Sequence, residues 1–149
     1  MPTMTQATIR AATIEDMPKV VACQELFYLE SPWVTLLGKP DPLYAGGWML
    51  ERLMNDSESQ LFVADRDGEL IGLCGGSILP VPMVPNVRYA WEWTFWVTHE
   101  WRHTDTAGQL WQAFCDWARE HRASLTVRGR VRAVVDGQLR ETLSWEKLT

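Results

Sequence analysis

The apolar positions at the start of the chain predict a short strand followed by a helix. Residues 7–12 are interpreted as the strand, and Thr13 precedes Asp16 by three positions, a spacing typical of a helix N-terminus with an acidic first turn. Apolar residues then recur at helical spacing. We expect this helix to end at the Ser31-Pro32 pair, because the residue before a proline avoids helical geometry.

A second helix and a hairpin are predicted next. Helical spacing of apolar side chains favours a helix over residues 43–54, after a proline-containing loop at residues 39–42. Two apolar runs, residues 61–64 and 70–73, then flank a turn that ends in Asp67-Gly68. An Asp-Gly pair between apolar runs is a strong hairpin signal, so the two runs should form antiparallel strands.

Residues 89–97 are predicted to form the next strand. The prolines between residues 80 and 88 indicate a loop before it, since proline cannot donate a sheet hydrogen bond. Tryptophans cluster in this strand, which indicates buried core, or alternatively an aromatic substrate wall or a partner surface. Strand alternation predicts one face formed by Trp91, Trp93, Phe95 and Val97 and an opposite face formed by Glu92, Thr94, Trp96 and Thr98.

The last third of the chain predicts one helix and a tail of strands. Thr104 or Asp105 can cap the helix. Its shared face would be formed by Leu110, Phe114, Trp117 and His121. Residues 124–127 look like a strand, and residues 129–135 fit either a short helix or another strand. Residues 139–148 alternate as a terminal strand does.

The composition is that of one globular domain spanning residues 1–149. Hydrophobic residues make up 46% and charged residues 22% of the chain, which is enough apolar material for one core. The net charge of −5, without a long basic run, argues against nucleic-acid binding. The first residues do not resemble a signal peptide and no apolar run has the length of a membrane span. We therefore expect a cytoplasmic protein without membrane association.

Two smaller groups of residues bear on function. Arg128, Arg130 and Arg132 are spaced to share one face of a strand, where they would form either a solvated surface or a phosphate contact. The three cysteines are far apart and include no C-x-x-C pair. They indicate neither a disulfide framework nor a zinc ribbon, and they are typical of a reducing compartment.

The predicted order of elements and three sequence stretches resemble the GNAT (Gcn5-related N-acetyltransferase) family over nearly the whole chain. Residues 61–72 are similar to its central hairpin, residues 97–102 to a strand end followed by V-x-P-x-x-R, and residues 102–107 to its [QR]-x-x-G-x-[GA] loop. The resemblance implies an α/β (α+β) fold with a mixed, mainly antiparallel central sheet flanked by helices. It also implies acetyl transfer from acetyl-CoA to an amine of a small molecule or a protein.

The resemblance places a coenzyme A site where the strand meets the next helix. In the family this strand splays from its neighbour, and its backbone pairs with the pantetheine arm, which here would involve Phe95, Trp96 and Val97. Free N–H groups and the positive end of a helix dipole make the following loop suitable for a pyrophosphate. The loop residues are Arg102, His103, Thr104, Asp105, Thr106, Ala107 and Gly108.

Two departures from the family pattern bear on activity. Asp105 occupies the position of a loop glycine and adds a negative charge near the expected phosphates, although Gly108 follows closely and Asp105 also suits a helix cap. The family's general acid, a tyrosine before the final strand, has no counterpart, because the only tyrosines are Tyr28, Tyr44 and Tyr89. Backbone N–H groups would then polarise the thioester, and water would protonate the leaving thiolate.

Glu92 resembles an acidic residue that family members carry near this point, which makes it the candidate base for the amine proton. The alternative is an ordinary strand carboxylate. The acceptor pocket is expected at the loop of residues 80–88 and the first two helices, whose tryptophans and tyrosines suggest a partly apolar acceptor. Glu30 or Asp41 would hold an ammonium, and we also consider a homodimer.

Residues 99–103 spell H-E-x-x-H, the zinc-protease pattern in which two histidines one helical turn apart bind the metal. Here His99-Glu100-Trp101-Arg102-His103 directly follows a strand and falls across the loop of the acetyltransferase interpretation, so the histidines would not share a helical face. The sequence therefore favours an acetyltransferase without a metal over a zinc metalloprotease. A catalytically impaired protein of the same fold, acting only by binding, is the remaining alternative.

Overall fold

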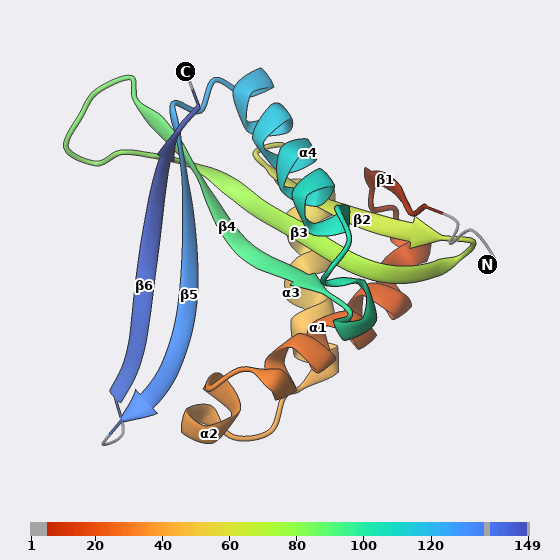
Figure 1. Cartoon of the computed structure of the whole chain (residues 1–149). Coiled ribbons are helices and arrows are strands. Elements are labelled where there is room, and N and C mark those ends of the chain that lie inside the picture. The colour runs from red at the N-terminus through yellow and green to blue at the C-terminus, as the bar shows by residue number, and fades with distance from the viewer. Residues whose placement is uncertain (1–5, 136–137, 149) are drawn as a thin grey trace.

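A computed structural model describes residues 6–135 and 138–148, apart from the side chains of residues 130–135 and 139–141. It contains a six-stranded sheet in the order β1-β2-β3-β4-β5-β6, with helices on both faces (Figure 1). Neighbouring strands pair antiparallel except β4 and β5, which are parallel. The prediction of a mixed, mainly antiparallel sheet is confirmed.

The elements follow the predicted order closely. The strands are β1 (Thr8–Ala11), β2 (Ser59–Arg66), β3 (Glu69–Pro80), β4 (Arg88–Val97), β5 (Leu125–Val135) and β6 (Gln138–Lys147). The α-helices are α1 (Met17–Glu30), α2 (Trp33–Leu37), α3 (Pro42–Asn55) and α4 (Thr106–Glu120), and single 3-10 turns precede α1 and α4 at Ile14–Asp16 and His99–Trp101.

Local signals set the ends of these elements, and the end of α1 and the hairpin turn were predicted. Ser31 has extended backbone geometry and ends α1 before Pro32, while the short helix α2 was not predicted. The β2–β3 hairpin turns through Asp67 and Gly68, both with positive φ, as a two-residue hairpin loop requires. Asp41 caps α3 by accepting hydrogen bonds from the N–H groups of the following turn.

The C-terminal tail is simpler than the sequence suggested. Residues 124–127 and 129–135 do not form separate elements, because one strand, β5, runs from Leu125 to Val135 and pairs with β6 along its whole length. The alternative of a short helix over residues 129–135 is therefore wrong. Strand pairing along both strands supplies the backbone hydrogen bonds that a helix would otherwise make internally.

The sheet separates two hydrophobic clusters. On one face α4 packs with Leu110, Phe114 and Trp117 against β3 and β4, as the helical spacing predicted. On the other face α1 and α3 cover β2 and β3, around Val20 and Met49 (Figure 1). A Cβ on the α3 residue Gly46 would lie 2.9 Å from a methyl carbon of Val21 in α1, so glycine allows the close approach of the two helices.

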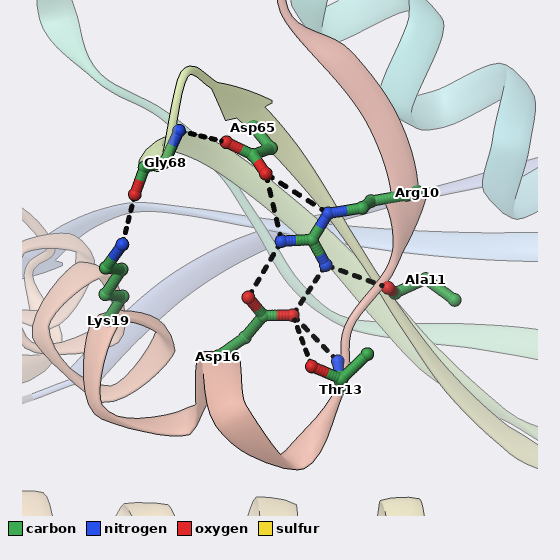
Figure 2. Close-up of polar contacts among 7 residues, drawn as sticks. All are labelled: Arg10, Ala11, Thr13, Asp16, Lys19, Asp65 and Gly68. Carbon is green, nitrogen blue, oxygen red and sulfur yellow. Dashed lines mark hydrogen bonds and ion pairs between the residues drawn. The ribbon is translucent and has the colours of Figure 1, made fainter.

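A cluster of charged side chains ties the N-terminal strand to the hairpin (Figure 2). The Arg10 guanidinium donates to Asp16 at 2.6 and 2.8 Å and to Asp65 at 3.1 and 3.2 Å. Asp16 also accepts hydrogen bonds from the backbone N–H and the hydroxyl of Thr13, which confirms the predicted capping arrangement. The hydrogen bond from Arg10 lowers the pKa of Asp16 more than any other contact does, against the opposing effect of burial.

All three cysteines, Cys23, Cys74 and Cys115, are buried and unpaired, as expected from their spacing. In the part of the chain that the structure describes, no helix has both the length and the apolar character needed to span a bilayer.

Candidate active site

A β-bulge interrupts the pairing of β3 and β4 near the middle of the sheet. Gly75 pairs with Thr94 and Gly76 pairs with Glu92, which leaves Trp93 as an extra residue on β4. A Cβ on Gly76 would lie 2.1 Å from the carbonyl oxygen of Trp91 and 2.9 Å from the Phe114 ring. Only glycine fits at this position, so the sequence of β3 permits the bulge in β4.

The bulge overturns the predicted faces of the strand. A Cβ on Gly76 would point at Phe114 of α4, so Glu92, directly opposite, lies on the α4 face together with Phe95 and Val97. Trp93 instead joins the cluster under α1 and α3. The prediction that Trp93 shares a face with Phe95, and Glu92 a face with Trp96, was wrong, because one extra residue shifts the alternation by one position.

Glu92 is buried on this face, with 8% of its surface exposed. Its charge acts on the thiol of Cys74, which packs in the core beneath α4. Burial raises the pKa of Cys74 well above its usual value, and the negative charge of Glu92 is the next largest cause. The Glu92 carboxylate therefore lies inside the molecule, next to the β-bulge between β3 and β4.

Strands β4 and β5 diverge directly before the bulge. Their parallel pairing covers only Tyr89 with Leu125, Ala90 with Thr126 and Trp91 with Val127. Beyond these pairs β4 continues to Val97 along β3, whereas β5 continues along β6, and the two strands separate in Figure 1. The splayed strand pair expected from the family resemblance is thus present.

The open edge of β4 offers backbone groups of alternate residues. The N–H of Thr98 donates to the Ile71 carbonyl on β3. Since backbone groups alternate sides along a strand, those of Trp96 also point toward β3, while those of Phe95 and Val97 point toward the gap. The Trp96 side chain lies on the α1 face, where its indole N–H donates to Glu30 at 3.1 Å.

The start of α4 lies beside this edge and has N–H groups outside the helix ladder. The first bond of the ladder runs from Gln109 N–H to the Asp105 carbonyl, so the N–H groups of Ala107 and Gly108 precede it. The Thr104 hydroxyl lies 3.4 Å from the Thr106 nitrogen and acts as a weak cap. Open space surrounds Gly108, where an added Cβ would have no atom within 4 Å.

Asp105 occupies the N-cap position of α4 but makes no capping hydrogen bond with its side chain. Its side chain is exposed next to the N–H groups of the first turn. The sequence left open whether this residue caps the helix, and Thr104 performs that task instead. The Asp105 carboxylate is therefore directed to solvent, close to the position expected for the phosphates.

Arg102 connects the end of β4 to the end of α1. Its Nε donates to the Val97 carbonyl at 2.8 Å, and one Nη donates to Glu30 at 2.6 Å. The hydrogen bond from Arg102, followed by the one from Trp96, lowers the pKa of Glu30. Arg102 thus positions the strand end and the loop, while His103 is exposed in the turn that follows.

The H-E-x-x-H segment lacks the geometry that zinc proteases use. His99–Trp101 form one 3-10 turn, and Arg102 and His103 lie in a non-helical turn, so the two histidines are not one α-helical turn apart. His99 contacts Arg102, with Nδ1 at 3.4 Å from a guanidinium nitrogen. Within residues 6–135 and 138–148, no group of three potential ligands among His, Cys, Asp and Glu is placed to hold a metal.

The family's tyrosine has no counterpart in this sequence, and the described residues between α4 and the end of β6 contain no helix, because β5 pairs with β6. The tyrosines lie elsewhere: Tyr28 donates to the Gly38 carbonyl, Tyr44 is exposed on α3, and Tyr89 contacts Trp145 with the ring centroids 5.8 Å apart.

Of the three arginines singled out in the sequence, Arg128 on β5 makes aromatic and ionic contacts. Its guanidinium lies 4.6 Å from the centroid of the Trp111 ring and 3.7 Å from Glu146. The Arg130 and Arg132 side chains lie outside the described residues.

A pocket of about 300 Å³ lies on the opposite face of β4, at the bulge. Its lining residues are Gln24, Tyr44, Ala45, Trp48, Met49 and Trp93. The acceptor pocket was expected at the first two predicted helices and the loop of residues 80–88. Helices α1 and α3 line this pocket, but no residue of that loop does. Neither Gln24 nor Met49 was predicted from the sequence as a site residue. The aromatic residues of these helices were the only feature of the sequence that indicated a pocket here. Glu30 and Asp41 do not line the pocket, since Glu30 binds Arg102 and Asp41 caps α3.

Several solved structures are similar to this chain in fold. The chain is 12% identical to a predicted acetyltransferase from Clostridium acetobutylicum whose structure holds acetyl-CoA, with a TM-score of 0.66 over 78% of this chain and 76% of the other. It is 20% identical to ribosomal-protein-alanine N-acetyltransferase from Brucella melitensis, with a TM-score of 0.65 over 83% and 74% of the two chains. A third similar structure is AAC(6')-Iy bound to a bisubstrate analogue, at 20% identity and a TM-score of 0.62 over 80% and 76%.

These structural similarities establish the fold of the chain, and the match to a family model establishes its family. No curated protein sequence matches the chain. The model of the acetyltransferase (GNAT) family matches residues 22–134, a stretch that includes β4, the loop after it and all of α4. The chain therefore belongs to the GNAT acetyltransferase family.

Proposed function

We propose that this protein is an N-acetyltransferase that uses acetyl-CoA to acetylate an amine. The observation that carries the proposal is the open edge of β4 beside the first turn of α4. An extended chain with amide groups can pair with the open edge, and a pyrophosphate can accept hydrogen bonds from N–H groups at a helix start. Coenzyme A carries both groups in one molecule, and a similar structure was solved with acetyl-CoA.

The residues present fit coenzyme A, with one exception. The backbone of Phe95 and Val97 would face the pantetheine arm, and the N–H groups of Ala107 and Gly108 would face the pyrophosphate. Arg102 already binds the Val97 carbonyl, so its contribution is to hold this strand end in place. The exception is the exposed carboxylate of Asp105, which would weaken phosphate binding by like-charge repulsion.

Glu92 is the proposed base of the reaction. The amine nitrogen attacks the thioester carbonyl carbon, the carbon–sulfur bond breaks, and the amine proton passes to the Glu92 carboxylate directly or through water. The leaving thiolate takes a proton from water, since no tyrosine stands at the family's position. The position of Glu92 supports this role, since the residue is buried directly after Trp91, where the pairing of β4 with β5 ends.

Isothermal titration and a thiol-release assay test the proposal together. Coenzyme A and acetyl-CoA should both bind, and a panel of primary amines should contain at least one that releases the free thiol of coenzyme A. The protein's own thiols should react slowly with the reagent, because Cys74 is buried and burial raises the pKa of Cys115 to about 11. Absence of binding at millimolar coenzyme A would refute the proposal.

The second candidate function is binding without catalysis. Two observations favour it: the exposed Asp105 carboxylate at the expected phosphate position, and the β5–β6 pairing, which leaves no helix for a tyrosine acid in the described residues. A protein that binds acetyl-CoA but transfers no acetyl group to any amine of the panel, between pH 6 and 9, would support this candidate over the enzyme.

A further inference from the structure

We infer that the pocket beside the bulge binds the acceptor, and that the acceptor is a small primary amine with a flat apolar body. The inference rests on the proposed function, because it assigns the substrate class of that same site. The volume of about 300 Å³ lies at the lower end of small-molecule pockets and suits a body the size of one aromatic ring system.

The walls of the pocket are aromatic and fixed. The rings of Trp48 and Trp93 meet edge to face, with centroids 5.2 Å apart and planes at 89°. The indole N–H of Trp93 donates to the Ser77 hydroxyl at 3.1 Å, which holds the ring in place and uses its polar atom. These rings present hydrocarbon surface to a ligand, so a flat apolar group gains most from binding there.

The polar groups of the pocket are few and carry no negative charge. Gln24 is the only lining residue with a side-chain amide, and its oxygen accepts from the Thr94 hydroxyl at 2.6 Å, which leaves its NH₂ group to a ligand oxygen. None of the six lining residues has a carboxylate, and the Arg52 guanidinium lies 4.9 Å from the centroid of the Trp48 ring. A polyamine or an amino sugar with several ammonium groups would meet no opposite charge here and one like charge.

The pocket also lies where an acceptor is needed. Its wall residue Trp93 is the bulged residue of β4, between Glu92 and Thr94, and the splay from β5 begins at the preceding Trp91 pair. An apolar body held against Trp93 lies on the α1 and α3 face of β4, so its amine approaches the reaction past the edge of β4 that the splay from β5 leaves open.

Titration of amines into the protein saturated with coenzyme A tests the inference. Tryptamine and 2-phenylethylamine should bind at least tenfold more tightly than spermidine and should be acetylated when acetyl-CoA replaces coenzyme A. Ala45→Phe, which fills the pocket, should weaken binding of tryptamine at least tenfold. Leu43→Phe is the matched control on the same helix, because Leu43 is 90% exposed and outside the pocket, and it should change nothing.

The outcomes separate this inference from the proposed function. Tighter binding of spermidine by the parent protein, or equal tryptamine affinity in the parent and in Ala45→Phe, would overturn the inference even if coenzyme A still binds. Coenzyme A affinity measured on each variant reports whether the variant is folded. The comparison of amines uses the parent protein alone and needs no variant. If the parent protein does not bind coenzyme A, the proposed function itself is refuted.

Discussion

Gly76 lies directly opposite Glu92 across the β3–β4 pair, and a Cβ at Gly76 would come within 2.1 Å of the Trp91 carbonyl oxygen. The atom in the way belongs to the backbone and cannot rotate aside. The bulge of β4, and with it the direction of the Glu92 side chain, therefore depends on a glycine in the neighbouring strand.

Replacing this glycine should destabilise the fold. We expect Gly76→Ala to lower the free energy of unfolding by about 3 kcal/mol, since an added methyl group overpacks a rigid site. Urea unfolding followed by circular dichroism measures it. Gly47→Ala on α3 is the control, because a Cβ there meets nothing within 4 Å, and alanine should stabilise this helix by about 0.5–1 kcal/mol. A neutral Gly76→Ala would contradict the account of the bulge.

Removing the charge of Asp105 should tighten coenzyme A binding. The Asp105→Asn variant loses the repulsion of the phosphates but no capping hydrogen bond, since the parent side chain makes none. We expect about a threefold to tenfold lower Kd at low salt, with a smaller gain at high salt because salt screens the repulsion. The control Asp116→Asn removes the same charge from the same helix, far from its first turn, and should leave the Kd unchanged. Unchanged affinity in Asp105→Asn would place the phosphates elsewhere.

Neutralising the proposed base should separate binding from turnover. A positioned base contributes roughly 10²–10⁴-fold to rate, so Glu92→Gln should lower kcat by about that factor while coenzyme A binds as before. The comparison requires an amine that the parent acetylates and a pH series from 6 to 9. Glu100→Gln, an exposed acidic residue in the following loop, is the control. Equal rates for Glu92→Gln and the parent would make Glu92 a structural residue.

The charged cluster around Arg10 predicts a loss of stability in acid. The pKa of Asp16 is lower in the folded protein than its ordinary value of 3.8, so its contribution to stability is present above pH 4 and is lost as the pH falls below it. Asp65, with its pKa lowered by the Gly68 N–H and by Arg10, adds to the same trend.

Asp16→Asn should therefore be less stable than the parent at pH 6 and should lose less stability on acidification. Urea unfolding at several pH values between 3 and 7 measures the two slopes. The control is Asp67→Asn in the hairpin turn, since Asp67 takes no part in the contacts of Figure 2 and asparagine tolerates its positive φ. Parallel pH profiles for Asp16→Asn and the parent would show that the cluster adds nothing in acid.

Protein purified without added metal should contain no stoichiometric zinc. His99 and His103 are exposed in consecutive turns and do not share an α-helical face. Elemental analysis measures the zinc content. About one zinc per chain, lost in His103→Ala, would contradict this prediction.

The sequence by itself determined the features whose causes are local. The Asp67-Gly68 turn, the end of α1 before Pro32 and the helix after the loop at residues 102–105 each depend on backbone preferences of a few adjacent residues. The family resemblance predicted the splayed edge of β4, because the order of helices and strands that supports the resemblance can be predicted from the sequence.

Only the tertiary structure decided which way the Glu92 and Trp93 side chains point. Strand alternation assumes one residue opposite one residue, and the bulge arises from contact with Gly76, a residue distant in sequence. The same holds for Asp105, whose role as a cap was equally compatible with the sequence until Thr104 was seen beside the Thr106 N–H. Pairing between strands and competition between neighbouring side chains are properties of the assembled fold, so no local pattern reveals them.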